Sequence, residues 1–170
     1  MRSAALHSLS LSLARQPRLV ALSRSLVRRV HPRDRLGRIA AVFGFVSQAV
    51  DLRGARAGPA GGISSLAALT LLAGEDHGAS LLLCALLQSL GERARVERTR
   101  ELAFVRVELD LRDVARLPPH AELMVSGGRA RYYLPLDARR ARSPLGFLPR
   151  EVRLALARRR GLQATRFRAA

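Results

Sequence analysis

Residues 74–91 read Gly-Glu-Asp-His-Gly-Ala-Ser-Leu-Leu-Leu-Cys-Ala-Leu-Leu-Gln-Ser-Leu-Gly, and this stretch decides the fold. A polar turn leads directly into an apolar run that is long enough for a helix. The run ends on Gly91, a residue type that readily adopts the left-handed conformation of a helix C-cap. Because leucines surround the predicted helix on nearly every side, we expect it to be the buried central helix of the domain.

Two helices are predicted on the N-terminal side of this stretch. Pro17 opens the first at a position where a missing N–H is harmless, and His31-Pro32 ends it. Asp34 can cap the second, which we expect over residues 35–50. In both helices the apolar residues recur every three or four positions, which is typical of packing by one stripe. These residues are Leu19, Leu22, Leu26 and Val30 in the first helix, and Leu36, Ile39, Phe43 and Val46 in the second.

The residues between the second helix and the central one read as a loop over 51–62 and a short helical segment over 64–72. After Gly91, residues 93–98 and 102–111 alternate between apolar and polar side chains, which predicts two antiparallel strands.

The remainder of the chain is predicted to hold one more strand and a helix. A linker with Pro118-Pro119 and Gly127-Gly128 precedes the strand, over residues 130–136. Pro149 starts a terminal helix that Gly161 stops. The expected fold class is therefore α+β, with helices packed on a small antiparallel sheet.

Length and composition favour one folded domain with two basic flanks. The chain has 170 residues and is 48% hydrophobic, which is enough for a substantial core. Residues 1–16 are rich in Ser, Leu and Ala and have no acidic residue, so we expect an N-terminal extension that need not be packed; an organellar transit peptide has a similar composition. Residues 17–148 form the predicted domain, and residues 149–170 a basic C-terminal helix and tail.

The net charge of +17 is concentrated at the two ends of the chain. Residues 1–33 hold seven Arg and no acidic residue, and residues 138–170 hold ten Arg and one. Nucleic-acid or anionic-surface binding through these arginine-rich ends is one candidate function. Every basic residue is Arg, which the coding bias of a high-GC genome would also explain.

The single cysteine, Cys84, cannot form an internal disulfide, which favours a reducing compartment. No apolar stretch approaches the roughly 18 residues of a membrane span. We therefore expect a soluble, cytoplasmic protein without a transmembrane segment.

The pattern Gly74-x-Asp76-x-x-x-Ser80-Leu-Leu-Leu-x-Ala-Leu-Leu-x-Ser-Leu-Gly91 resembles the core helix of the transglutaminase-like superfamily. Bacterial members of that family carry Gly-Asp-Cys at the start of this helix and Leu-Gly at its end. Residues 102–109 resemble the family strand His-x-aromatic-Val-x-Val, and Tyr133-Leu-Pro-Leu-Asp137 is similar to the strand that ends in the third catalytic residue. The resemblance covers roughly residues 18–148 and implies a papain-like cysteine protease core.

The same resemblance implies that the catalytic residues have been lost. The family uses a Cys–His–Asp triad in which a thiolate attacks a carboxamide or peptide carbonyl. Here Asp76 stands at the cysteine position and Leu102 at the histidine position, so Asp137 alone matches the triad. Cys84 is no substitute, because it lies more than two helical turns beyond Asp76 inside the leucine run.

The sequence therefore predicts a pseudoenzyme that binds a protein or peptide or serves as a scaffold. Glu75, Asp76, His77 and Asp137 would line the old cleft and give it a negative floor. Residual or altered hydrolase or acyl-transfer activity in that cleft is a further alternative, for example with Ser80 as nucleophile and His77 as base. No cofactor is expected, and no metal site either, because neighbouring residues rarely all point inward.

Overall fold

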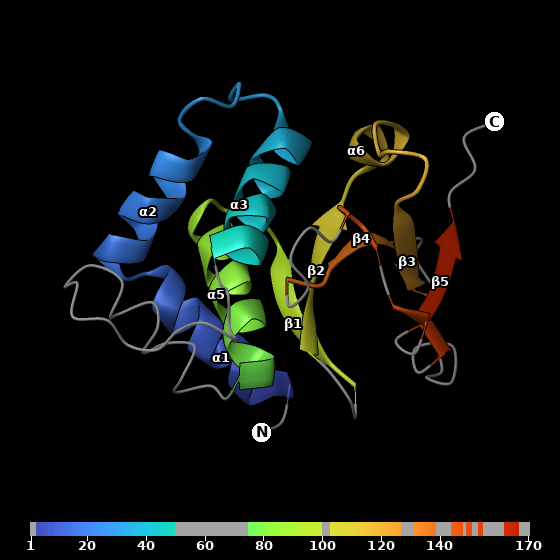
Figure 1. Ribbon diagram of the computed structural model, residues 1–170, viewed down its shortest axis with the longest axis horizontal. Helices are drawn as coiled ribbons and strands as arrows, with labels where there is room; N and C mark the ends of the chain where they lie inside the picture. The colour runs from blue at the N-terminus through green and yellow to red at the C-terminus, as the bar shows by residue number, and fades with distance from the viewer. Residues whose placement is uncertain are drawn as a thin grey trace.

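The computed structural model describes residues 3–49, 75–99, 103–126, 131–138, 144–147, 149–150, 153–154 and 162–166. In this part of the chain the long helices gather on one side of a five-stranded antiparallel sheet, as Figure 1 shows. Helices and sheet share one hydrophobic core. The predicted α+β architecture, with helices packed on an antiparallel sheet, is confirmed.

Helix α5, Glu75–Ser89, occupies the centre of the fold. Each residue from Leu81 to Leu87 is at most 1% exposed, so no side of the helix meets solvent along its middle. Helices α1 (Ser3–Ala14), α2 (Pro17–Val27) and α3 (Arg35–Ala49) pack against it on one side, and strands β1 (Ala94–Arg98) and β2 (Ala103–Leu109) on the other (Figure 1). The leucine run therefore forms the buried central helix, as its composition predicts.

Gly91 ends α5 and turns the chain into the sheet. Its φ of 84° lies in the left-handed region that favours glycine. The N–H of Gly91 donates to the carbonyl of Gln88 at 2.9 Å, and the N–H of Glu92 donates to the carbonyl of Leu87 at 3.0 Å. This pair of bonds is a Schellman motif, which satisfies the last carbonyls of the helix and delivers the chain to β1.

Residues 3–14 are not an unpacked extension, and this prediction was wrong. They form α1, in which Leu6, Ser10 and Leu13 are buried along one face. Ser10 is small enough for α1 to approach α5 closely, and its Oγ lies 3.6 Å from the Sγ of Cys84. The Ser- and Leu-rich composition of this segment resembles that of an unpacked leader. Its apolar face becomes buried only because α5 packs against it.

Helix α3 follows its predicted pattern, whereas α2 ends at Val27, so Val30 of the predicted stripe lies beyond the helix. Pro17 lies at the start of α2, and the apolar stripe of α3 is buried. Asp34 caps α3, since its Oδ1 accepts a hydrogen bond from the N–H of Gly37 at 3.2 Å. A side chain at position 37 would collide with that carboxylate, so the glycine is required for the cap to form.

The sheet has the strand order β1-β2-β4-β3-β5, with β3 at Glu122–Ser126, β4 at Arg131–Leu136 and β5 at Leu162–Arg166. All neighbouring strands are antiparallel. Val105 in β2 pairs with Leu136 in β4, and Val107 pairs with Leu134; all four belong to the core that α5 shares. Because side chains alternate along a strand, Arg106 and Tyr133 lie on the opposite, outer face.

Two predictions for the second half of the chain were wrong. The expected linker contains a short helix, α6 (Leu111–Ala115), and the strand β3. The expected basic tail contains β5, which forms the sheet edge beside β3. Both strands have five residues, and their pairing across the sheet stabilises them more than their local sequence does.

The predicted loop over 51–62, the helical segment over 64–72 and most of the terminal helix lie outside the described residues. Within the described residues, no helix combines the length and apolar character that crossing a membrane requires.

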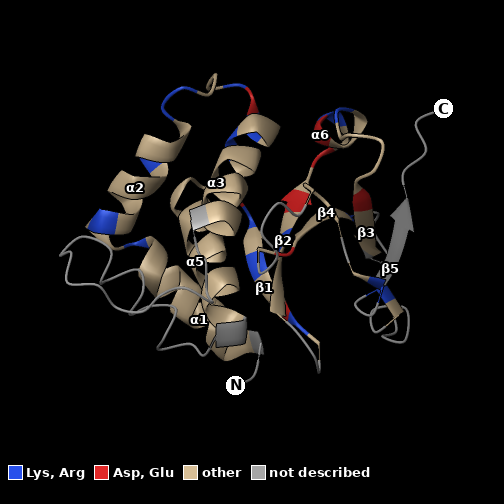
Figure 2. Ribbon diagram, in the orientation of Figure 1, with Lys and Arg blue, Asp and Glu red and all other residues tan. Residues whose placement is uncertain are grey.

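Arg35 connects the first turn of α3 to one end of the sheet. Its guanidinium lies 2.8 Å from the carboxylate of Glu92 and 2.6 Å from that of Asp113, and it donates to the carbonyl of Glu108 at 2.7 Å. Burial alone would lower the pKa of Arg35, but hydrogen bonds and attraction from Glu92 and Asp113 outweigh it and raise the pKa. Figure 2 shows acidic residues at the end of β2 and in α6, near the basic start of α3. Arg35 thereby neutralises two carboxylates that are almost fully buried.

Replacing Arg35 by methionine should lower the free energy of unfolding by about 3 kcal/mol, because Asp113 would lose the counter-charge that Arg35 supplies and Glu92 would keep only its longer contact with Arg38. Urea unfolding of Arg35→Met, Glu92→Gln and the double variant measures this. The double variant should lose less than the sum of the two single changes. Additive losses would show that the two side chains do not interact. Arg93→Met is the matched control, since its exposed pair with Glu108 should contribute less than about 1 kcal/mol.

Candidate functional site

The start of α5 is where the sequence places the candidate site. Helix α5 begins at Glu75, so Glu75 and Asp76 occupy its first turn, where the partial positive charge of a helix N-terminus favours anionic groups. The side chains of both residues lie outside the described part of the structure. His77 follows in the same turn and is partly exposed.

A hydrogen bond attaches this end of α5 to the sheet. The Oγ of Ser80 donates to the carbonyl of Ala103, the first residue of β2, over 2.9 Å. Ser80 is completely buried, and its hydroxyl is engaged by this bond. It therefore positions the helix and is not presented to a substrate.

Asp137 lies at the adjacent end of β4. Val105 in β2 pairs with Leu136, so Asp137 follows β4 close to where β2 begins. Asp137 is 1% exposed, so it is a structural carboxylate with interaction partners of its own and does not form part of an open surface. Leu102, at the position of the family histidine, immediately precedes β2 in sequence and lies outside the described residues.

The structure thus brings together the three chain segments that the sequence singles out, namely the start of α5, the start of β2 and the end of β4. Of the three predicted triad positions, the structure describes the side chain of Asp137, and those of Asp76 and Leu102 lie outside the described residues. Among the described residues, no group of three or more His, Cys, Asp or Glu side chains is arranged to hold a metal ion.

Cys84 lies in the middle of α5 and is completely buried. Burial raises the pKa of its thiol to about 12, although hydrogen bonds with Ser10 and the backbone of Val96 act in the opposite direction. Because the thiolate is the nucleophilic form, Cys84 is inert in the folded protein. This agrees with the sequence-based view that it is no substitute for the missing catalytic cysteine.

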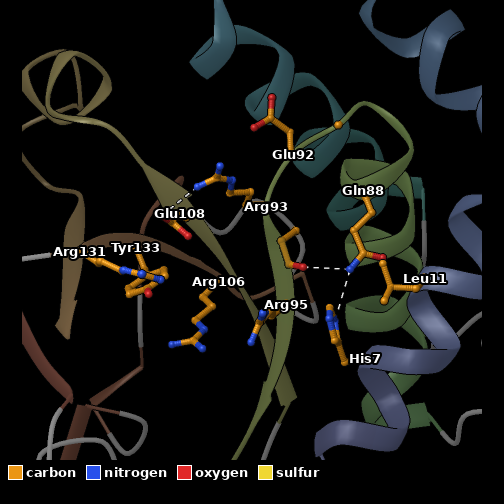
Figure 3. A pocket seen from close by; sticks show the side chains of 12 residues that line it. His7, Leu11, Gln88, Glu92, Arg93, Arg95, Arg106, Glu108, Arg131 and Tyr133 are labelled. Atoms are coloured by element: carbon orange, nitrogen blue, oxygen red, sulfur yellow. Dashed lines mark hydrogen bonds and ion pairs between the residues drawn. The ribbon is translucent and has the colours of Figure 1, made fainter. Parts of the chain in front are cut away.

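A second surface lies near the other end of α5. We use the name basic pocket for a cavity of about 420 Å³ beside the edge strand β1. It is lined by four arginines and two glutamates, together with Leu11 and His7 of α1, Gln88 of α5 and Tyr133 of β4. The arginines are Arg93, Arg95, Arg106 and Arg131. Figure 3 shows the side chains of Arg95 and Arg106 near each other on neighbouring strands, with Arg131 and Tyr133 beyond them.

Two of the four arginines of the basic pocket lie close to a glutamate. Arg93 lies 3.4 Å from Glu108, and the Nε of Arg106 lies 2.9 Å from Glu97. The geometry of the second contact is not that of a hydrogen bond, so this buried nitrogen has no acceptor among the described residues. The guanidinium of Arg106 also lies over the ring of Tyr133, 4.5 Å from its centroid, in a cation–π contact.

The pKa of His7 is affected by the positive charge of this pocket. Burial, followed by repulsion from Arg95, lowers the pKa of His7 below its ordinary value. Its Nδ1 lies 3.5 Å from the side-chain nitrogen of Gln88, which also donates to the carbonyl of Ala94 at 2.9 Å (Figure 3). His7 is therefore a neutral link between α1 and α5 at neutral pH.

A neighbouring cavity of about 450 Å³ has a different character. Arg35, Arg38 and Glu92 line it, and they are paired with one another. These charges hold α3 against the sheet, so we assign this cavity a structural role.

The basic pocket is not predicted by the sequence. The alternation along residues 102–111 correctly places Arg106 on the polar face of its strand. The alternation does not show that Arg95 pairs opposite Arg106. Nor does it show that β4 lies beside β2, which brings Arg131 and Tyr133 to the same face. A charge pattern along single strands is visible in sequence, but its assembly across strands is not.

Native Cys84 should react with a thiol reagent at pH 8 no faster than the protein unfolds, because a thiol with a pKa of about 12 supplies very little thiolate. Unfolding in guanidinium should restore the rate of an ordinary cysteine. The raised pKa also predicts a stability contribution that is present below the unfolded-state value near 9 and is lost as the pH rises toward 12. Rapid labelling of the folded protein would disprove the assignment of Cys84 as an inert core residue.

Comparison with known proteins identifies no relative: no protein-family model matches the sequence, and neither a curated protein nor a solved structure matches it.

Proposed function

We propose that this chain is a catalytically inactive transglutaminase-like domain that binds a protein or peptide at the start of α5. One observation carries the proposal, which is the meeting of the start of α5, the start of β2 and the end of β4. The Ser80–Ala103 hydrogen bond joins the first two segments, and the pairing of Val105 with Leu136 joins the second to the third. In the family that the sequence resembles, these segments carry the cysteine, the histidine and the aspartate.

The candidate nucleophiles support the loss of the family reaction. A carboxylate at Asp76 would have to form an anhydride to attack an amide, and it is a far weaker nucleophile than a thiolate. Cys84 is buried with a raised pKa, and the hydroxyl of Ser80 is buried and bonded to the backbone. None of these three groups offers an activated nucleophile to a substrate at the start of α5.

The charge of this region supports a binding role. Glu75 and Asp76 place two acidic residues in the first turn of α5, within a chain whose net charge is +17. The helix N-terminus stabilises such carboxylates in their ionised form. A partner segment that carries lysine or arginine would complement them. Solvent-exposed pairs of this kind contribute about 0.2–1 kcal/mol each, so we expect moderate affinity.

The purified wild-type protein should show no amine incorporation and no peptidase activity, because it lacks both the thiolate and the imidazole of the family triad. Both assays should be repeated on Asp76→Cys combined with Leu102→His, which restores the two missing residue types; activity gained there would place the two positions in one site. Wild-type activity that Asp76→Ala abolishes would disprove the pseudoenzyme.

A fluorescein-labelled peptide that alternates lysine and leucine should bind the wild-type protein, and Asp76→Asn should weaken binding by about threefold through loss of one ionic contact. Fluorescence polarisation measures both affinities. Asp34→Asn is the matched control, since it removes one negative charge at the start of α3 and an asparagine still caps that helix. Equal weakening by both substitutions would mean that overall charge, and not the start of α5, attracts the peptide.

A further inference from the structure

We propose that the basic pocket beside the edge strand β1 binds an acidic segment of a partner protein. The basic pocket includes Gln88, twelve residues after Asp76 in the same helix. At 1.5 Å per residue, this separates the two positions by roughly 18 Å along α5. The inference therefore concerns a second site and does not depend on the function proposed for the first.

The pairing of β1 with β2 provides the first argument. Arg95 stands directly opposite Arg106 across these antiparallel strands. Like charges directly opposite each other destabilise a sheet. Natural sequences tolerate such local conflicts mainly where a function requires them. An anionic ligand between the two guanidiniums would remove the repulsion.

The distribution of ion pairs provides the second argument. Glu108 partly neutralises Arg93, and Glu97 partly neutralises Arg106. Glu92 also lines the basic pocket, but its carboxylate is engaged by Arg35 and Arg38.

Two of the lining arginines have no counter-charge among the described residues. Arg95 and Arg131 are exposed, and neither forms an ion pair with any residue that the structure describes. The lowered pKa of His7, to which Arg95 contributes, is a separate sign of uncompensated positive charge on this surface. Guanidinium groups of this kind bind carboxylates in a bidentate manner.

The remaining lining residues favour a peptide over a nucleic acid. Sequence-tolerant binding of single strands relies on aromatic rings on which bases stack. Tyr133 is only 8% exposed, and Arg106 already lies over its ring. Leu11, in contrast, is 42% exposed at the rim, on the α1 side, and offers an apolar contact. An acidic segment with one apolar side chain complements both features.

The size of the cavity limits what enters it. A volume of about 420 Å³ lies within the range of roughly 300–1,000 Å³ that is usual for small-ligand sites. The basic pocket therefore accommodates a few side chains of an extended segment and not a folded domain. The interaction should weaken as salt is added, since exposed charges are screened beyond about 8 Å at physiological ionic strength.

The test uses the full-length protein and a fluorescein-labelled peptide composed of glutamate and leucine, monitored by fluorescence polarisation. The peptide should bind saturably, and Arg95→Gln combined with Arg131→Gln should weaken binding by about tenfold through loss of two charge-assisted contacts. The melting temperature of this variant should not fall, because the change removes the repulsion between Arg95 and Arg106 and no ion pair among the described residues. Leu11→Ala should weaken binding without changing any charge.

Three controls make the outcome decisive. Arg18→Gln combined with Arg24→Gln removes the same charge from the exposed surface of α2 and should change the affinity less than twofold. A peptide with glutamine in place of glutamate should not bind. A single-stranded thymidine oligonucleotide should bind more weakly than the acidic peptide. Equal loss in both double variants, binding of the glutamine peptide, or tighter binding of the oligonucleotide through Arg95 and Arg131 would each overturn the proposal.

Discussion

Burial of helix α5 is the constraint on which the rest of the structure depends. A leucine contributes about 1.5–3 kcal/mol when it moves from water into a core, so a helix with leucine on every side must be covered on every side. The sheet can cover only one side, and α1, α2 and α3 provide the remaining cover. This explains why residues 3–14 are part of the fold: without α1, a face of α5 that includes Cys84 would lie open.

The end of α5 then determines where charges are buried. The Schellman turn at Gly91 places Glu92 against the end of the sheet, where its carboxylate is nearly inaccessible. A carboxylate in that position requires a counter-charge, and Arg35 supplies it from the first turn of α3. The same guanidinium also holds Asp113 of α6. One turn therefore links the packing of the helices to the end of the sheet through a network of charges.

The two proposed surfaces lie at opposite ends of α5 and carry opposite charge. Acidic residues occupy its first turn, and the arginines of the basic pocket lie beyond its C-terminal part. This distribution agrees with the helix dipole, which favours anions at the N-terminus and cations at the C-terminus. In sequence, the two acidic residues of the first turn of α5 are thus separated from the basic pocket by the length of the helix.

The sequence by itself determined the elements whose patterns are local. The leucine run, the Gly91 cap, the Asp34 cap and the alternation of β2 are all visible in short stretches, because backbone geometry repeats every 3.6 or two residues. The resemblance to the transglutaminase-like superfamily likewise depends on the order of short motifs along the chain. The loss of catalytic residues at Asp76 and Leu102 stays a proposal. Only the tertiary structure decided the packing of α1, the strands β3 and β5 and the basic pocket. These features arise from contacts between residues far apart in sequence, such as Arg106 with Tyr133, where burial and pairing across strands outweigh local preference.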